Sequence, residues 1–403
     1  MKILKKTFDK MRPHFEEGGR LHSFKSVYDG FDTFLFTPTT TSTSGTHIHD
    51  AIDSKRTMII VVMALMPCLL FGMYNVGYQN HLACGMTTFP FWQLFFYGFL
   101  AVLPKIAVSY LVGLGIEFIV AQWRNEEIQE GFLVTGILIP MICPIGTPLW
   151  MIAVATAFSV IFVKEVFGGT GYNIFNVALV TRAFLFFAYP SSMSGDQPFI
   201  ARDTILGLGG NVADSFSGAT PLGEVAAMAG TDASMHLTAI NGATLSNWDL
   251  FFGLIPGSVG ETSTLCILIG AAILLLAGIA SWRIILSVFA GGAVMSLIAH
   301  LTATATYPAS FLSVEQQLCL GGFAFAAVFM ATDPVTAART NTGKYIYGFL
   351  VGVIAILIRT YNNGYPEGAM LAVLLMNAFA PLIDYCVVQC NIRRRMNRAK
   401  VNA

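Results

Sequence analysis

The chain has 403 residues, of which 55% are apolar and 11% charged, with 23 basic and 23 acidic side chains. Together with a mean hydropathy of +0.65, this composition excludes an ordinary soluble domain and indicates an all-α polytopic membrane protein. We therefore expect membrane lipid around the chain and no nucleic-acid partner.

In chain order, residues 1–56 are polar and charged without an apolar core, so they predict a cytoplasmic arm and not a cleavable signal. About ten transmembrane helices follow in two five-helix halves, 57–189 and 262–388, on either side of a polar loop, 190–261. A basic tail, 389–403, ends the chain. Because five is an odd number, tandem halves would face opposite ways, so the pattern is compatible with an inverted repeat. The individual spans are expected at 57–78, 94–121, 131–145, 148–165, 172–189, 262–280, 283–304, 317–332, 344–361 and 367–388.

The distribution of basic residues orients this bundle. If the N-terminus is cytoplasmic, all but four of the 23 Lys and Arg residues fall on the cytoplasmic side, as the positive-inside rule requires. The exceptions are Lys105, Arg182, Arg202 and Arg359. We therefore expect both termini in the cytoplasm and the loop 190–261 on the outer side of the membrane.

The outer loop contains a polar turn with the sequence Asp-Ser-Phe-Ser-Gly-Ala-Thr-Pro at 214–221. Thr220 stands before a proline that can open a short helix over 221–228, so we expect it to cap that helix. A phosphate bound or esterified there would be stabilised by free backbone N–H groups and the helix dipole. Alternatively Thr220 is only a cap. A second turn, 241–244, ends in Thr244 but lacks the serine and the acid.

Motifs along the whole chain resemble those of the B subunits of the bacterial sodium-translocating NADH:quinone oxidoreductases. The related D subunit of the Rnf electron-transport complex shares the Ser-Gly-Ala-Thr turn but typically starts near its first span, without the N-terminal arm. The motifs that carry the resemblance are Lys-Glu-Val-Phe-Gly-Gly-Thr-Gly at 164–171, Arg-Ala-Phe-Leu-Phe-Phe-Ala-Tyr-Pro at 182–190, Ser-Gly-Ala-Thr at 217–220, Gly-Ser-Val-Gly-Glu-Thr-Ser at 257–263, Met-Ala-Thr-Asp-Pro at 330–334 and Phe-Ala-Pro-Leu-Ile-Asp at 379–384.

The resemblance implies two flavins. FMN would be esterified through its phosphate to Thr220 by a dedicated flavin transferase, within a pattern that also includes Asp214, Ser217, Gly218 and Ala219. Riboflavin would be held without a covalent bond. The sequence has no glycine-rich dinucleotide fingerprint and no Walker loop, so NADH is expected on another chain.

The resemblance also implies a place and an activity. The chain would lie in the bacterial inner membrane with five other subunits and its flavin-bearing loop in the periplasm. Electrons would pass from FMN through riboflavin to ubiquinone or menaquinone, coupled to Na⁺ export. Inward electron movement favours outward cation movement, because one charge crossing the potential is worth about 2.3 kcal/mol per 100 mV. The alternatives are an Rnf D-type subunit and a non-redox carrier or channel of five plus five helices.

Three polar residues in the first half are candidates for flavin contacts. An arginine in the middle of a span is costly unless it is paired, so Arg182 either contacts a flavin or neutralises an acid. Asn173 and Asn176 lie in a glycine-rich bend before the same span, and their amides suit the polar edge of riboflavin. A capping or turn role for these asparagines is the alternative.

Carboxylates at the predicted inner membrane face are candidates for the Na⁺ pathway, because hard oxygen ligands suit a small alkali cation. Glu130, Asp333 and Asp384 match the sodium-uptake acids of the resembled family. Each could instead be a charge at a helix end. Glu130 also adjoins Gly131 and Phe132, beside a proline-broken hairpin, where we expect a quinone headgroup with the N-terminal arm as a lid. The alternative for this hairpin is simple packing.

Overall fold

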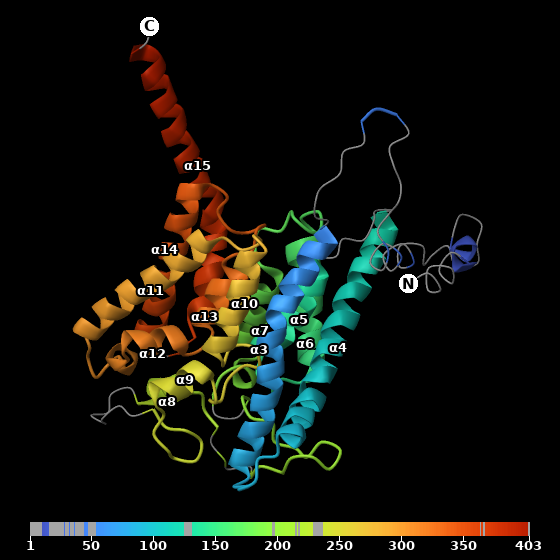
Figure 1. Cartoon of the computed structure of the whole chain (residues 1–403), viewed down its shortest axis with the longest axis vertical. Helices are drawn as coiled ribbons and strands as arrows, with labels where there is room; N and C mark the ends of the chain where they lie inside the picture. Colours follow the sequence, from blue (N-terminus) through green and yellow to red (C-terminus); the bar gives the residue numbers. More distant parts are fainter. Residues whose placement is uncertain are drawn as a thin grey trace.

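The computed structural model describes residues 10–15, 28, 32, 36, 44–46, 54–124, 131–195, 198–213, 216, 218–228, 237–362, 364–365 and 367–401. Every regular element within these residues is a helix, which confirms the predicted all-α membrane fold (Figure 1). Five helices are long and apolar enough to cross a membrane: α3 (Ser54–Ala83), α4 (Phe91–Arg124), α11 (Trp282–Leu301), α14 (Asn341–Tyr361) and α15 (Ala369–Val401).

The remaining predicted spans correspond to shorter or interrupted helices. A hydropathy profile does not reveal the residues at which these helices end. Helix α5 ends at Cys143, which has an extended backbone and precedes Pro144. The predicted eighth span is interrupted at Gly321, which has a φ of +61°. These shorter elements are α5 (Phe132–Ile142), α6 (Leu149–Ser159) continued by the π-helix η3 (Val160–Glu165), α7 (Val177–Ala188), α10 (Thr264–Leu276), α12 (Val314–Cys319), and α13 (Phe323–Phe325) continued by the π-helix η6 (Ala326–Met330).

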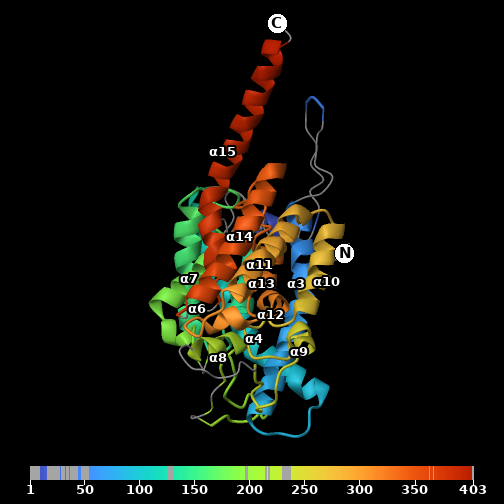
Figure 2. The ribbon, with the colours of Figure 1, turned by 90° about the vertical axis from the view of Figure 1, so that its left-hand side faces the viewer.

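Short helices decorate the polar segments: η1 (Arg12–His14), η4 (Pro190–Ser192), α8 (Pro221–Ala227), α9 (Asn247–Phe252) and η5 (Pro308–Phe311). Figures 1 and 2 show α8 and α9 at the end of the bundle opposite the C-terminal end of α15. The start of α3 lies at the same end of the bundle as the C-terminal end of α15. The loop that contains Thr220 and the basic tail therefore lie at opposite ends, as the charge pattern predicts.

Helix packing repeats between the two predicted halves. The α4–α6 contact has its counterpart in α11–α14, and the α6–α7 contact has its counterpart in α14–α15. The interrupted helices fit the same scheme, because α5 packs on α4 as α12 packs on α11. The α3–α4 contact of the first half has no comparable counterpart between α10 and α11. The inverted repeat and the residue boundaries of the two halves therefore stay predictions.

Candidate functional site

Thr220 caps α8, as its position before Pro221 predicts. Its Oγ1 accepts a hydrogen bond from the backbone N–H of Gly223 at 3.1 Å. Of the other residues in the motif, Gly218 is buried and Ala219 is half-buried. Asp214 and Ser217 lie outside the described residues.

Thr220 also opens onto a crevice between α7, α8 and the connection before α15. Arg182 and Phe186 of α7 line it, together with Tyr365 and Glu367 from that connection. The Phe186 and Tyr365 rings meet edge to face, with centroids 4.3 Å apart. The other lining residues are Met193, Ser194, Gly195, Phe199 and Gly223. The crevice thus combines aromatic walls, a guanidinium and the Thr220 hydroxyl.

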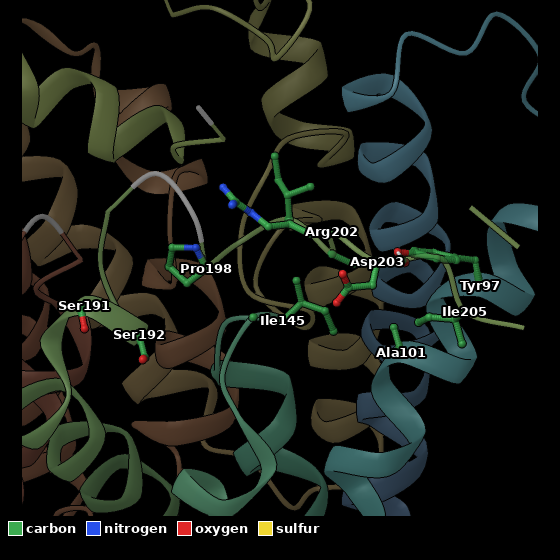
Figure 3. Close-up of a pocket in the computed structure, with 12 residues that line it drawn as sticks. Tyr97, Ala101, Ile145, Ser191, Ser192, Pro198, Arg202, Asp203 and Ile205 are labelled. Carbon is green, nitrogen blue, oxygen red and sulfur yellow. Dashed lines mark hydrogen bonds between the residues drawn. The ribbon is translucent and has the colours of Figure 1, made fainter. Parts of the chain in front are cut away.

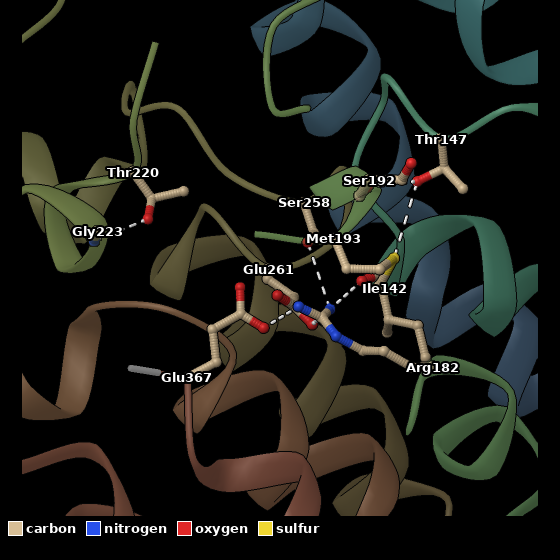
Figure 4. A network of polar contacts seen from close by, with 10 residues as sticks. All are labelled: Ile142, Thr147, Arg182, Ser192, Met193, Thr220, Gly223, Ser258, Glu261 and Glu367. Atoms are coloured by element: carbon tan, nitrogen blue, oxygen red, sulfur yellow. Dashed lines mark hydrogen bonds and ion pairs between the residues drawn. The ribbon is translucent and has the colours of Figure 1, made fainter. Parts of the chain in front are cut away.

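Arg182 is the centre of a buried polar network beside this crevice (Figure 4). Its side chain is 2% exposed and forms ion pairs with Glu261 at 3.0 Å and with Glu367. It also donates to the carbonyl of Ile142 at the end of α5, and to the Ser258 hydroxyl at 3.4 Å. Both sequence-based interpretations therefore describe part of the arrangement, because Arg182 neutralises acids and lines the crevice that holds Thr220.

A second buried arginine lies on the far side of Glu261. Arg359 of α14 is 1% exposed and donates to the Gln317 carbonyl at 2.5 Å, while its Nε and Nη2 have no hydrogen-bond partner. Two glycines at the α12–α13 break make room for both charges. A Cβ at Gly321 would lie 3.2 Å from Arg359 Nη2, and one at Gly322 would lie 3.0 Å from Glu261 Oε1.

A larger cavity of about 420 Å³ lies next to the crevice, on the other side of the segment 190–203 (Figure 3). Its lining includes Tyr97 and Ala101 of α4, together with Arg202 and Asp203. Tyr97 anchors this wall by donating its hydroxyl to the Asp203 carbonyl at 2.7 Å. None of the predicted site residues that the structure describes lines this cavity.

The two predicted riboflavin asparagines have partners within the protein. Asn176 caps α7 by accepting from the N–H of Leu179 at 3.2 Å, and its amide donates to Asp333 at 3.3 Å. Asn173 donates to the carbonyl of Phe175 at 2.9 Å within the bend. Capping and turn formation are thus present, and the side chain of Asn173 is also partly exposed.

The predicted quinone residues are tightly packed where the structure describes them. Glu130 lies outside the described residues, and a Cβ on Gly131 would lie 2.6 Å from Thr170 Cγ2. Phe132 is fully buried, and its ring fills a notch at Gly113 of α4 beside Tyr110. Phe132 therefore contributes packing at this position, and the quinone site stays a prediction.

We expect Gly113→Ala to lower the thermal midpoint of the purified protein. Its new Cβ would lie 1.8 Å from Phe132 Cζ, and overpacking of this kind typically costs about 1–3 kcal/mol. Gly115→Ala is the matched control, because nothing lies within 4 Å of a Cβ at that position. Equal midpoints for the two variants would show that the Phe132 ring moves aside freely.

Two of the three predicted Na⁺ acids are described, and they share no hydrogen-bond partner. Asp333 follows η6 and accepts from the N–H of Val335 at 3.0 Å and from the Thr336 hydroxyl at 3.1 Å. Burial raises the pKa of the Asp333 carboxyl, although these hydrogen bonds lower it in part. Asp384 lies on α15 and accepts from the N–H of Arg339 at 2.7 Å and from the Thr340 hydroxyl at 2.6 Å. Asp384 thereby ties α15 to the start of α14, which Thr340 caps.

The described residues contain no group of three or more His, Cys, Asp or Glu side chains placed to hold a metal ion. Sequence reasoning also missed three participants in the Thr220 crevice and its network. Glu261 stood within a recognised motif without an assigned role, while Tyr365 and Glu367 carry no local signal, because only the fold brings their short connection against α7.

Comparison with known proteins places the chain in a family. Residues 41–393 match the model of the NQR2, RnfD, RnfE family. Over 98% of the chain, it is 43% identical to the B subunit of the Na⁺-translocating NADH-quinone reductase of Chromohalobacter salexigens, covering 96% of that protein. The subunits of the same name from Azotobacter vinelandii and Pseudomonas aeruginosa are each 42% identical, over 98% of the chain and 99% of their own length. The chain therefore belongs to the NQR2, RnfD, RnfE family.

Proposed function

We propose that this chain is the membrane redox subunit of a Na⁺-translocating NADH:quinone oxidoreductase. It carries FMN esterified to Thr220 and a non-covalent riboflavin, and it passes electrons to ubiquinone or menaquinone in a process coupled to Na⁺ export. The observation that carries this proposal is the crevice where Thr220 meets Arg182 and aromatic side chains. The names and full-length coverage of the relatives support it.

The residues of the crevice suit attachment of a phosphorylated flavin at Thr220. The crevice itself has a volume of about 30 Å³, which is room for little more than a water molecule, so the flavin ring would lie outside it. Phe186 is half-buried and could contact an aromatic heterocycle at the mouth of the crevice, while Phe199 and Tyr365 are buried and form its walls. The guanidinium of Arg182 supplies a fixed positive charge in a site where burial strengthens electrostatic interactions. When bound, the flavins supply the electron-transfer chemistry, while the protein supplies placement and electrostatics.

The five other subunits, the flavin transferase and the bacterial inner membrane belong to the same proposal, with both termini cytoplasmic and Thr220 periplasmic. An Rnf D-type subunit is the related alternative within the family. B subunits of the Na⁺-translocating NADH-quinone reductase align with 98% of the chain, which favours a subunit of that reductase over an Rnf D-type subunit.

The proposal is tested by expressing the chain with and without the flavin transferase and separating it on a denaturing gel. We expect its band to fluoresce under ultraviolet light only when the transferase is present, because only a covalent flavin survives denaturation. A dark band in both preparations would contradict the covalent FMN and favour a non-redox carrier or channel.

We expect Asp384→Ala to weaken the Na⁺ dependence of quinone reduction by the assembled complex. The variant removes a carboxylate that would attract Na⁺, but it also removes hydrogen bonds to Arg339 and Thr340. Thr340→Val is the matched control, since it deletes the hydroxyl that caps α14 and leaves the carboxylate in place. The same loss of Na⁺ stimulation in Thr340→Val would assign Asp384 to helix anchoring and remove it from the Na⁺ pathway.

A further inference from the structure

The bundle has an apolar groove on its surface, of about 460 Å³, between α11 and α14. Leu286 and Ala290 of α11 line one side of it, and Tyr345, Ile346 and Phe349 of α14 line the other. These side chains are exposed at the surface of the described chain. Figure 1 shows α11 and α14 within the membrane bundle, away from α8 and α9. The groove therefore faces hydrocarbon or a neighbouring subunit.

Close helix contact shapes this groove. A Cβ on Gly291 would lie 2.1 Å from the carbonyl oxygen of Phe349, and one on Gly352 would lie 2.1 Å from that of Val288. With the two backbones so near each other, the side chains beside the contact form a continuous trough. The only lining hydroxyl on α11, that of Ser287, donates to the Arg283 carbonyl of its own helix at 2.7 Å. The α11 wall of the trough consequently offers no free polar group to a headgroup.

Positive charge stands at one end of the groove. Arg283 lies one helical turn before Leu286 on the same face of α11. Lys344 stands at the start of α14 at a similar level, on a flank of that helix that does not line the groove. No carboxylate in the described part of the chain forms an ion pair with either cation, and neither α11 nor α14 contains Asp or Glu. Arg283 donates to the Asn341 side chain at 2.7 Å, which holds its guanidinium between the two helix starts.

An aromatic pair lies at the same end of α11 and α14 as these two cations. The rings of Trp282 and Tyr345 meet edge to face with centroids 6.1 Å apart, and the Arg283 guanidinium lies 5.5 Å from the Trp282 ring centroid. Trp and Tyr are enriched where a membrane helix crosses from hydrocarbon to headgroups. The helix starts thus lie at headgroup depth, while the groove runs into the hydrocarbon.

We propose that this groove binds an anionic phospholipid of the leaflet on the basic side of the membrane. Its phosphate would lie beside Arg283, with Lys344 adding positive charge at the same end of the two helices, and one acyl chain would fill the trough. The two cations select negative charge, and the apolar lining accommodates a chain. A quinone, which carries no negative charge, would gain less from these cations, and the donor nearest its carbonyl groups would be the Tyr345 hydroxyl on the α14 wall.

The test measures phospholipid retained by the complete purified complex, using native mass spectrometry with added phosphatidylglycerol or phosphatidylcholine. We expect phosphatidylglycerol to be retained preferentially. In the double variant Arg283→Gln/Lys344→Gln its affinity should fall about thirtyfold, as about 1 kcal/mol per basic side chain near a membrane surface implies. Ala290→Trp fills the trough and should displace the lipid without removing charge.

The double variant Arg394→Gln/Arg395→Gln is the control, because it removes the same charge from the exposed end of α15 and should retain phosphatidylglycerol. Equal retention of the two lipids, or an unchanged affinity in the Arg283→Gln/Lys344→Gln variant, would overturn the proposal. Loss of co-purified quinone in Ala290→Trp with lipid unchanged would assign the groove to quinone, and loss of a subunit would assign it to a protein contact. Flavin fluorescence of the chain should not change in any of these variants.

Discussion

Thr220→Val is expected to abolish the covalent flavin of this chain completely. The substitution keeps the shape of the side chain but removes the hydroxyl that would carry the phosphoester. It also removes the acceptor for the N–H of Gly223, which costs about 1 kcal/mol of helix stability. The band on a denaturing gel should be dark, and the intact mass of the chain should fall by one FMN ester.

Two controls separate loss of the flavin from loss of the helix cap. Ser246→Ala removes the capping box of α9 in the same outer loop and should leave the fluorescence unchanged. Thr244→Val removes the hydroxyl of the second turn and should also leave it unchanged. Fluorescence that persists in Thr220→Val and disappears in Thr244→Val would move the attachment site to residue 244.

Arg182→Met should cause the largest loss of stability among single substitutions at the site. The variant leaves the buried Glu261 and the half-buried Glu367 without their common cation. Removing one partner of a buried ion pair typically costs about 3–5 kcal/mol. The measurement is the thermal midpoint of the purified complex, with Arg393→Met on the exposed end of α15 as the control.

A double variant tests the electrostatic origin of that loss. Arg182→Met/Glu261→Gln removes one of the two uncompensated charges and should recover part of the midpoint, since the residues act as a coupled pair. A midpoint in Arg182→Met equal to that of Arg393→Met would show that water or Arg359 already balances the acids. A double variant less stable than Arg182→Met alone would point to lost packing as the main cause.

The helical class and the placement of the Thr220 loop opposite the basic tail were predictable, because hydropathy and charge act over whole segments. Helix ends were less predictable. The α12–α13 break depends on Gly321 and Gly322, which accommodate Arg359 and Glu261 from other elements. Hydropathy averaged over a window of sequence does not show such a break and therefore predicts an uninterrupted span.

The site itself was predictable only in part. Thr220 and Arg182 were recognisable because a motif and an intramembrane charge mark them individually. Their surroundings were not, since Arg182 meets acids that lie 79 and 185 residues later in the chain. The burial of Phe132 was not predictable either, because a residue next to a turn in the sequence proves to be a fully buried core side chain.

The crevice around Thr220 has a consequence for the biogenesis of the protein. Its walls come from α7, from the segment that contains Phe199, and from Tyr365 near the last helix. The crevice can therefore close only after nearly the whole chain has been synthesised and inserted. Until then Thr220 lacks the neighbours that form the crevice. If a transferase modifies it as we propose, the order of insertion would give that enzyme a period to reach the hydroxyl before the fold half-buries it.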